Sequence, residues 1–135
     1  MSKTTEPRNV THLMEFFGLD RREARKAELL FTEVNLRAGE HIAWQDGVAS
    51  QLLILIDAEA DVLRDGRTVA RLGRGETSGE ISMTGRSTRM TADVVVTRSG
   101  KALAAGRSDV ARLDHRGRFY RELARRAEQR SAELH

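Results

Sequence analysis

Hydrophobic residues recur every three or four positions near both ends of the chain, which is the spacing of one face of a helix. The first such run predicts a helix over residues 10–17 that ends at Gly18. Asp20 and Glu23 have the spacing of a capping box, which predicts a second helix to about residue 33. The last runs predict helices at 108–113 and 118–133. We therefore expect helices within 10–33 and 108–134, and disorder over the polar residues 1–9.

Between these helices the pattern changes to short apolar runs separated by turn residues. Residues 52–56 are all Leu or Ile, which predicts a buried strand. Asp65-Gly66 lies between two alternating segments and is a strong signal for a type I′ hairpin. Ser99-Gly100 marks a second turn, between strands expected at 92–97 and 102–105. Seven or eight such strands, with turns about every 8–12 residues, indicate an antiparallel roll or barrel.

The order of elements predicts an α+β fold in a single domain that covers residues 1–135. We expect a jelly-roll-like antiparallel β-roll of about eight strands over residues 34–107, with helices on either side of it in the sequence.

Composition excludes several classes of function. The chain has no cysteine, which excludes disulfide scaffolds, thiolate metal sites and thiol nucleophiles. Its four histidines lack a metal-binding spacing, and the sequence has neither G-x-S-x-G nor S-x-x-K to activate a serine. We therefore expect no metal site, no cofactor and no enzyme activity.

The net charge of +3 comes from the C-terminal part of the chain. Residues 107–135 hold eight arginines against five acidic residues, whereas residues 1–106 hold equal numbers of basic and acidic residues. Because the surplus is confined to one tail, we expect no DNA binding from this chain. The N-terminus lacks an apolar signal segment and no stretch is long enough to span a bilayer, so we expect a cytoplasmic protein without a membrane partner.

A glycine-rich stretch at residues 73–79 introduces the candidate chemistry. As a dinucleotide fingerprint it is one residue too long, and as a P-loop it lacks the Lys-Ser/Thr pair. Taken alone, the glycines are also consistent with two turns between strands. The continuation is more specific, because Arg89 lies ten residues after Gly79. The segment that leads to it begins Gly79-Glu80-Ile81-Ser82-Met83.

In this segment the chain resembles the cyclic nucleotide-binding domain family, which includes the bacterial catabolite activator protein and the regulatory subunits of protein kinase A. That family has a phosphate-binding cassette with the order Gly-Glu-aliphatic-small-aliphatic and an arginine ten residues after the glycine, and residues 79–91 match it. The resemblance covers about residues 16–134 and includes the turns at Ala38-Gly39-Glu40, Asp46-Gly47 and Asp65-Gly66. It implies a β-roll with a short helix in the cassette and a cyclic nucleotide as ligand.

The resemblance implies a role for each cassette residue. The backbone N–H groups of Ile81 and Ser82, after the flexible Gly79, would point at the cyclic phosphate. The planar guanidinium of Arg89 would pair with that phosphate. Glu80 would accept a hydrogen bond from the ribose 2′-hydroxyl. The simpler alternative is that Glu80 and Arg89 form an ordinary ion pair across a loop.

Three positions depart from the family pattern. Ser78 stands where an aromatic or large aliphatic residue is common, and Glu59 stands where a glycine is usual. Met90 follows the arginine, where members that bind ligand usually have Ala, Ser or Thr, so Thr91 supplies the nearest hydroxyl. In this family a Thr directly after the arginine favours cGMP, so the resemblance favours cAMP over cGMP here. Val69 would contact the sugar or base, or else would be a plain core valine.

The last helix corresponds to the family's lid region. Its apolar stripe, which includes Phe119 and Leu123, is also consistent with simple packing against the domain. In related domains a side chain from this helix stacks over the purine. Arg126 and Arg130 are the candidates, because a guanidinium plane stacks well on an aromatic face. The alternative use of this basic helix is contact with a protein partner or a second copy of the chain.

These residues together predict a stand-alone sensor domain that binds a cyclic nucleotide, cAMP above all, and repositions its terminal helices. The alternative is a degenerate domain that no longer binds nucleotide and serves as a protein-interaction or dimerisation module. We do not expect a transcription factor of the catabolite activator type, because these 135 residues do not encode a DNA-binding unit after the last helix. Whether the chain is complete or part of a longer protein stays open.

Overall fold

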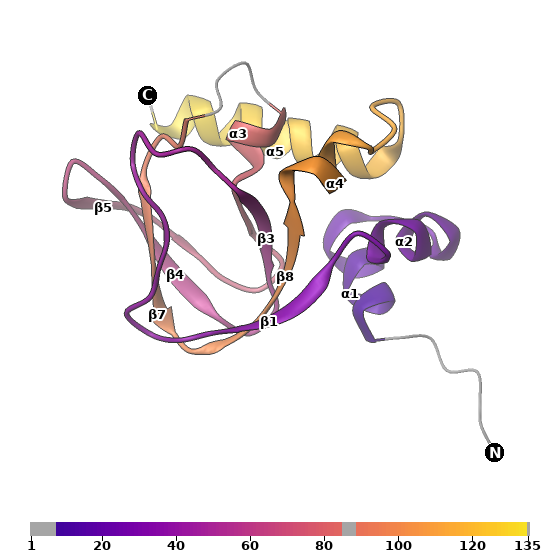
Figure 1. Cartoon of the computed structure of the whole chain (residues 1–135), viewed down its shortest axis with the longest axis horizontal. Coiled ribbons are helices and arrows are strands. Elements are labelled where there is room, and N and C mark those ends of the chain that lie inside the picture. Colours follow the sequence, from indigo (N-terminus) through magenta and orange to yellow (C-terminus); the bar gives the residue numbers. More distant parts are fainter. Residues whose placement is uncertain (1–7, 85–88, 135) are drawn as a thin grey trace.

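The computed structural model describes residues 8–84 and 89–134 as five helices and eight strands. The helices are α1 (Arg8–Phe17), α2 (Arg21–Glu28), α3 (Glu80–Thr84), α4 (Arg107–Ala111) and α5 (Arg118–Leu134). The strands are β1 (Thr32–Leu36), β2 (His41–Ala43), β3 (Gln51–Leu55), β4 (Glu59–Arg64), β5 (Arg67–Leu72), β6 (Thr77–Ser78), β7 (Asp93–Arg98) and β8 (Gly100–Gly106). Figure 1 shows the strands curled into a roll, with α3 and α5 across one end of it. None of these helices is long and apolar enough to cross a membrane.

Two four-stranded antiparallel sheets form the roll. One sheet has the strand order β1-β8-β3-β6 and the other has the order β2-β7-β4-β5. An apolar cluster fills the space between them; it includes Leu53, Leu55, Val62, Val94 and Val96. The prediction of an α+β fold with a jelly-roll-like β-roll of about eight strands is confirmed.

A second apolar layer lies between the first sheet and the helices. Leu52 and Ile54 of β3 belong to it, together with Leu13 of α1 and Leu123 of α5. Successive side chains of a strand point to opposite faces, so β3 contributes to both layers and is buried from residue 52 onward. The predicted buried strand is therefore the one that joins the roll to the helices that cover it.

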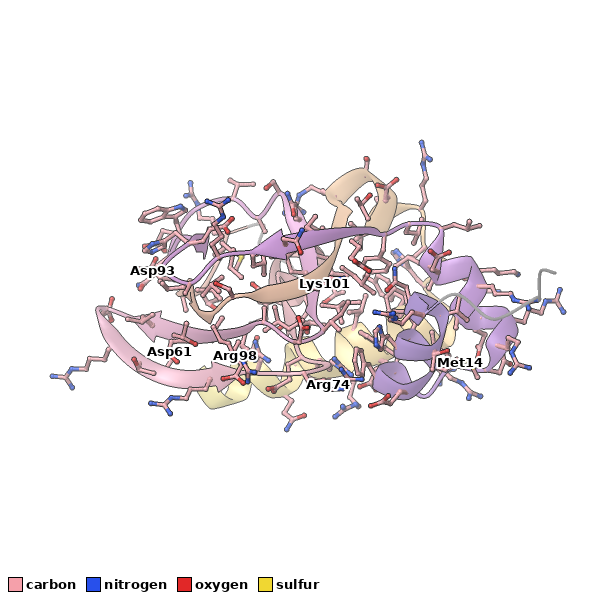
Figure 2. All side chains as sticks on the ribbon, turned by 90° about the horizontal axis from the view of Figure 1, so that it is seen from below. Met14, Asp61, Arg74, Asp93, Arg98 and Lys101 are labelled. Atoms are coloured by element: carbon pink, nitrogen blue, oxygen red, sulfur yellow. The ribbon has the colours of Figure 1, made fainter. Side chains whose placement is uncertain are left out.

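Charged side chains cover the outside of the roll (Figure 2). Lys101 pairs with Glu33, and Arg98 pairs with Glu59, each at 3.3 Å. Arg98 and Glu59 are cross-strand neighbours on β7 and β4. The unusual Glu59 thus takes part in a surface ion pair, a class of contact that stabilises a fold only slightly.

Two short-range predictions are confirmed in detail. Asp20 and Glu23 form both hydrogen bonds of a capping box at the start of α2, at 2.8 and 3.1 Å. Asp65 and Gly66 both have positive φ, +52° and +82°, as a type I′ turn requires. Both signals concern residues that contact each other within four positions of the chain, where the sequence is most informative.

Two boundary predictions are wrong. Residues 8 and 9 belong to α1 and are not disordered, whereas residues 1–7 of that expectation lie outside the described residues. The second helix ends at Glu28 instead of continuing to residue 33, because Thr32 and Glu33 pair with Ala104 and Leu103 of β8. That pairing joins segments about seventy residues apart, so helical periodicity does not reveal it.

The connection at Ser99 passes from one sheet to the other. β7 pairs with β2 and β4, whereas β8 pairs with β1 and β3. Gly100 lies close to the turn between β3 and β4. A Cβ atom on Gly100 would be 2.5 Å from the Ala58 nitrogen of that turn. The two-residue strand β6, which pairs with β3, was not expected from the sequence.

Candidate functional site

The segment from Gly79 to Thr84 turns the chain from β6 into the short helix α3. Gly79 has a φ of +98°, and a Cβ atom on it would collide with the Gln51 carbonyl of the neighbouring strand. A side chain is therefore excluded at the position where the sequence has its glycine. This turn places Glu80 at the first position of α3, where it is only 1% exposed.

The buried Glu80 carboxylate has one cationic partner from α5. Its Oε2 atom lies 3.5 Å from Nη1 of Arg130, a side chain that is itself largely buried. The same Nη1 donates to the Thr77 carbonyl at 3.2 Å. The other carboxylate oxygen, Oε1, has no hydrogen-bond partner among the described residues. A buried oxygen without a donor is costly, so this position favours a ligand with a hydroxyl or N–H group.

Arg89 lies at the other end of the cassette, on the surface. Its guanidinium Nη1 donates to the Asp46 carbonyl at 2.7 Å, and its backbone bridges to Val48. The next residue, Met90, exchanges two backbone hydrogen bonds with Asp46 and Gly47. The loop before β3 therefore holds Arg89 in place, whereas residues 85–88 lie outside the described residues.

Several of the expected ligand-binding residues surround one small cavity. Gly79, Glu80, Ile81, Met90, Thr91 and Arg130 line it, together with Ser78 and three residues of the roll. We call it the cassette cavity. Its volume is only about 20 Å³, whereas pockets for small molecules usually have about 300–1,000 Å³. The cassette cavity is therefore too small for such a ligand in this structure.

Ser82 contacts Met90, which lines this cavity. Ser82 is buried, and its hydroxyl lies 3.4 Å from the Met90 sulfur. Met90 thus packs inward against α3, at the position where the family usually has a small residue. Ser78 is also buried and pairs with Leu53, so it faces the interior of the roll without filling it as an aromatic residue would.

Four residues expected at the site do not line the cassette cavity, namely Ser82, Arg89, Val69 and Arg126. Val69 lies on β5 with 47% of its surface exposed, so the alternative of a core valine is wrong. Arg126 lies one turn before Arg130 on α5, where it donates to the carbonyls of Phe16 and Gly75. Its guanidinium carbon also lies 4.1 Å from the centre of the Phe17 ring. In this structure Arg126 fastens α5 to α1 and to the turn before β6.

Arg107 is a site neighbour that the sequence analysis did not identify. From the first position of α4, its guanidinium donates to the Ala49 carbonyl at 2.6 Å and to the Ser82 carbonyl at 3.5 Å. It thereby connects α4, the loop before β3 and the cassette helix. A single arginine at the start of a helix carries no local signal for such a contact, because its partners lie 25 and 58 residues away.

Electrostatic contacts along α5 are strong around Glu122. Hydrogen bonds from Arg125 and Arg126 lower the pKa of Glu122 from 4.5 to about 2, although partial burial opposes the shift.

On α1, burial and the nearby charge of Arg74 lower the pKa of His12. Among the described residues, no group of His, Asp and Glu is arranged to hold a metal ion.

Comparisons with known proteins agree with this geometry. The chain matches the family described as "Cyclic nucleotide-binding domain" over residues 33–116. No curated protein matches it in sequence. Among solved structures, the catabolite activator protein of Thermus thermophilus is 27% identical, with a TM-score of 0.74 over 87% of this chain and 58% of that one.

Two further structures share the fold at lower identity. The cAMP-bound PfPKA-R is 20% identical, with a TM-score of 0.77 over 93% of this chain and 43% of that one. A putative cyclic nucleotide-binding protein from Geobacter metallireducens is 16% identical, with a TM-score of 0.73 over 93% of this chain and 96% of that one. The present chain thus spans about half the length of the first two proteins.

Proposed function

Because the chain belongs to the cyclic nucleotide-binding domain family, we propose that it binds cAMP at residues 79–91 and acts as a sensor without catalysing a reaction. The observation that carries this proposal is the Glu80 carboxylate, which is buried beside α5 with one oxygen lacking a partner among the described residues. A ribose 2′-hydroxyl is a donor of the right kind for that oxygen.

The phosphate would lie between α3 and Arg89. The first turn of α3 offers the backbone N–H groups of Ile81 and Ser82, and Gly79 has no side chain to obstruct their approach. Arg89 has five N–H donors, so it can bind two phosphate oxygens while it keeps a contact with the Asp46 carbonyl. Thr91 lies in the wall of the same cavity.

Ligand entry requires the cassette cavity to expand. A volume of about 20 Å³ does not hold a nucleotide, and Arg130 occupies the space beside Glu80. We therefore propose that cAMP displaces Arg130 from Glu80 and repositions α5, so that the helix reports occupancy. Arg130, once released, would be available to stack on the base. cAMP is favoured over cGMP because Met90 offers no hydroxyl next to Arg89.

Calorimetric titration of the chain with cAMP and cGMP tests this proposal. We expect saturable binding of cAMP, weaker binding of cGMP, and a loss of about 30-fold or more in cAMP affinity for Arg89→Ala, because a charge-assisted phosphate contact is removed. The matched control is Arg71→Ala, which removes an exposed arginine of β5 outside the cassette cavity. Absence of heat at millimolar cAMP would instead support the degenerate interaction module.

Hydrogen exchange of α5 tests the repositioning separately. The expected result is a change in exchange within residues 118–131 on addition of cAMP, together with little change in strands β4 and β5. If cAMP binds and α5 exchanges at the same rate with and without it, the helix is a passive cap and only the sensor part of the proposal fails.

A further inference from the structure

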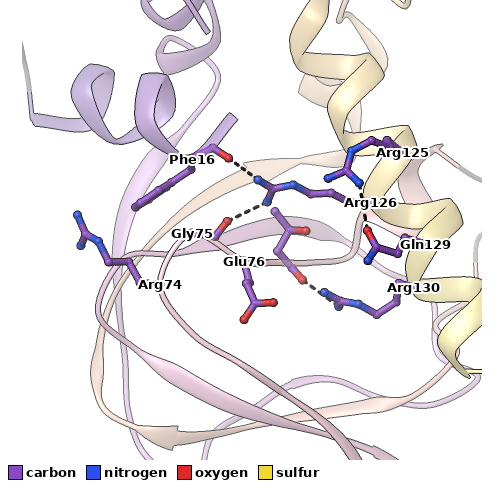
Figure 3. Close-up of a pocket in the computed structure, with 9 residues that line it drawn as sticks. Phe16, Arg74, Gly75, Glu76, Arg125, Arg126, Gln129 and Arg130 are labelled. Atoms are coloured by element: carbon purple, nitrogen blue, oxygen red, sulfur yellow. Dashed lines mark hydrogen bonds between the residues drawn. The ribbon is translucent and has the colours of Figure 1, made fainter. Parts of the chain in front are cut away.

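A second cavity, much larger than the cassette cavity, lies beside α5 and shares Arg130 with the cassette cavity (Figure 3). It has a volume of about 380 Å³ and is bounded by α5, by the end of α1 and by the turn before β6. This volume is within the range of small-molecule pockets. We call it the arginine cavity; it is lined by Phe16, Arg74, Gly75, Glu76, Thr77, Arg125, Arg126, Gln129 and Arg130.

The wall of this cavity is strongly basic. Arg125, Arg126 and Arg130 come from α5, and Arg74 comes from the turn on the opposite side (Figure 3). Glu76 is the single carboxylate among these lining residues. The carboxylates that pair with the four arginines, Glu15, Glu80 and Glu122, do not line the cavity. An occupant therefore meets three guanidinium groups from α5 and one carboxylate, whereas the Arg74 guanidinium lies over the Phe16 ring beside Glu15 and is turned away from α5 (Figure 3).

Two of these guanidinium groups are fixed and two are accessible. Arg126 and Arg130 are only 17% and 16% exposed, and contacts to main-chain carbonyls hold them. Arg74 and Arg125 are 51% and 60% exposed at the rim. Each guanidinium has five N–H donors, and the contacts within the described residues use three on Arg126. The cavity thus has two arginines that are held in place, Arg126 and Arg130, and two exposed arginines, Arg74 and Arg125.

The floor of the cavity depends on Gly75. This residue has a φ of +81°, and a Cβ atom on it would be 2.9 Å from the Phe16 ring. The missing side chain lets the turn approach α1, so that one guanidinium, Arg126, reaches the carbonyls of both. Beside it, the buried Thr77 hydroxyl oxygen has no hydrogen-bond partner among the described residues. Thr77 is fully buried, so this hydroxyl lies behind the surface of the cavity.

We propose that the arginine cavity is a binding site for a small anion with two or more phosphate groups, separate from the cassette. Guanidinium groups on opposite walls favour an anion that has oxygens on several sides, and the planar guanidinium is well suited to phosphate oxygens. One phosphate contacts Arg126 and Arg130 on α5, and the other contacts the two exposed arginines, Arg125 and, once it turns toward the opening, Arg74. The site shares Arg130 with the cassette cavity, but the proposal does not require that the chain binds cAMP.

Calorimetric titration with inorganic pyrophosphate, at ionic strength held constant with sodium chloride, tests the proposal. We expect saturable binding of one pyrophosphate per chain. The double variant Arg74→Gln/Arg125→Gln should bind at least about tenfold more weakly, because two charge-assisted contacts are removed. The matched control is Arg71→Gln/Arg121→Gln, which removes one exposed arginine from β5 and one from α5 outside the cavity. The control should bind as the wild type does.

Two outcomes would overturn the site. One is no saturable heat with millimolar pyrophosphate, and the other is equal loss in the two double variants, which would indicate nonspecific attraction to a basic helix. Sedimentation with phosphatidylcholine vesicles that contain phosphatidic acid separates a free ligand from a lipid headgroup. Pelleting of the chain that pyrophosphate does not reverse would contradict a site for a soluble anion. The Arg89→Ala variant should still bind pyrophosphate. This result would show that pyrophosphate binding does not require the cassette arginine.

Discussion

Glu80 and Arg130 are two side chains whose contact joins the cassette to α5. Both are largely buried, and their atoms lie 3.5 Å apart. Removing one member leaves the other charge without its partner in a site with little water. We expect Arg130→Gln to lower the free energy of unfolding by about 1–3 kcal/mol, as measured by urea denaturation.

The double variant Glu80→Gln/Arg130→Gln checks that this effect comes from the pair. It should be more stable than the sum of the two single variants implies, because neither residue is then left as an unpaired charge. Strictly additive losses would show that the two side chains stabilise the fold through separate contacts.

Gly79 and Gly73 form a matched pair of glycines on either side of β6. Alanine at Gly79 would need a positive φ and would collide with the Gln51 carbonyl, whereas a Cβ atom at Gly73 meets nothing within 4 Å. We expect Gly79→Ala to cost about 2–4 kcal/mol and Gly73→Ala to change stability by about 0.5 kcal/mol at most. Thermal unfolding monitored by circular dichroism measures both. Similar melting temperatures for the two variants would contradict the requirement for glycine at residue 79.

Among single residues, sequence alone identified the cassette but not its contacts. The order of Gly79, Glu80 and Arg89 could be recognised because those residues lie within eleven positions of each other. The partner of Glu80 is Arg130, fifty residues further along, and no local pattern encodes that pairing. The same reason explains why Arg126 was expected over the base and is found against α1 instead.

At the scale of elements, α5 contains a carboxyl group, Glu122, whose pKa is strongly lowered. The pKa of Glu122 is about 2 in the folded protein against an ordinary value of 4.5. A lowered pKa means that the ionised form stabilises the fold above about pH 4.5, and that this contribution is lost as the pH falls toward 2. The size of the shift corresponds to about 3 kcal/mol at neutral pH.

Glu122→Gln should therefore be about 2–3 kcal/mol less stable than the wild type at pH 7, and the difference should shrink as the pH falls below about 4.5. Urea denaturation at a series of pH values measures it. Glu128→Gln, on the exposed side of the same helix, is the control and should show little difference at any pH. A gap between Glu122→Gln and wild type that persists at pH 3 would mean that packing, not charge, is responsible.

Elements whose signals are local were predicted well, and those fixed by distant pairing were not. The capping box before α2 and the turn at Asp65-Gly66 depend on residues a few positions apart. The end of α2 and the strand β6 depend on pairing with β8 and β3, which lie far away in the sequence. Leu29 follows directly after the last residue of α2 and is 82% exposed, so it does not contribute to the apolar core.

At the scale of the whole molecule, α5 packs against only one of the two apolar layers that the structure describes. Among the side chains that the structure describes, the cluster between the sheets contains none from α5, whereas the layer outside the first sheet includes Phe119 and Leu123. We expect a chain truncated after Gly117 to keep its β-roll, to unfold at a lower urea concentration and to bind cAMP more weakly. Far-ultraviolet circular dichroism and calorimetry measure these changes. Complete loss of the β signal would show that the roll cannot fold without α5.

Three arginines of α5 attach the helix to main-chain carbonyls of the rest of the chain. Arg118 reaches the carbonyl of Gly18, Arg126 reaches those of Phe16 and Gly75, and Arg130 reaches that of Thr77. Every residue type has a carbonyl, so replacing side chains in α1 or in the roll leaves these acceptors in place. This polar part of the attachment is therefore inherited through the arginine codons of α5. Selection can strengthen or weaken the hold on this helix, one codon at a time, while the sequence of the roll stays unchanged.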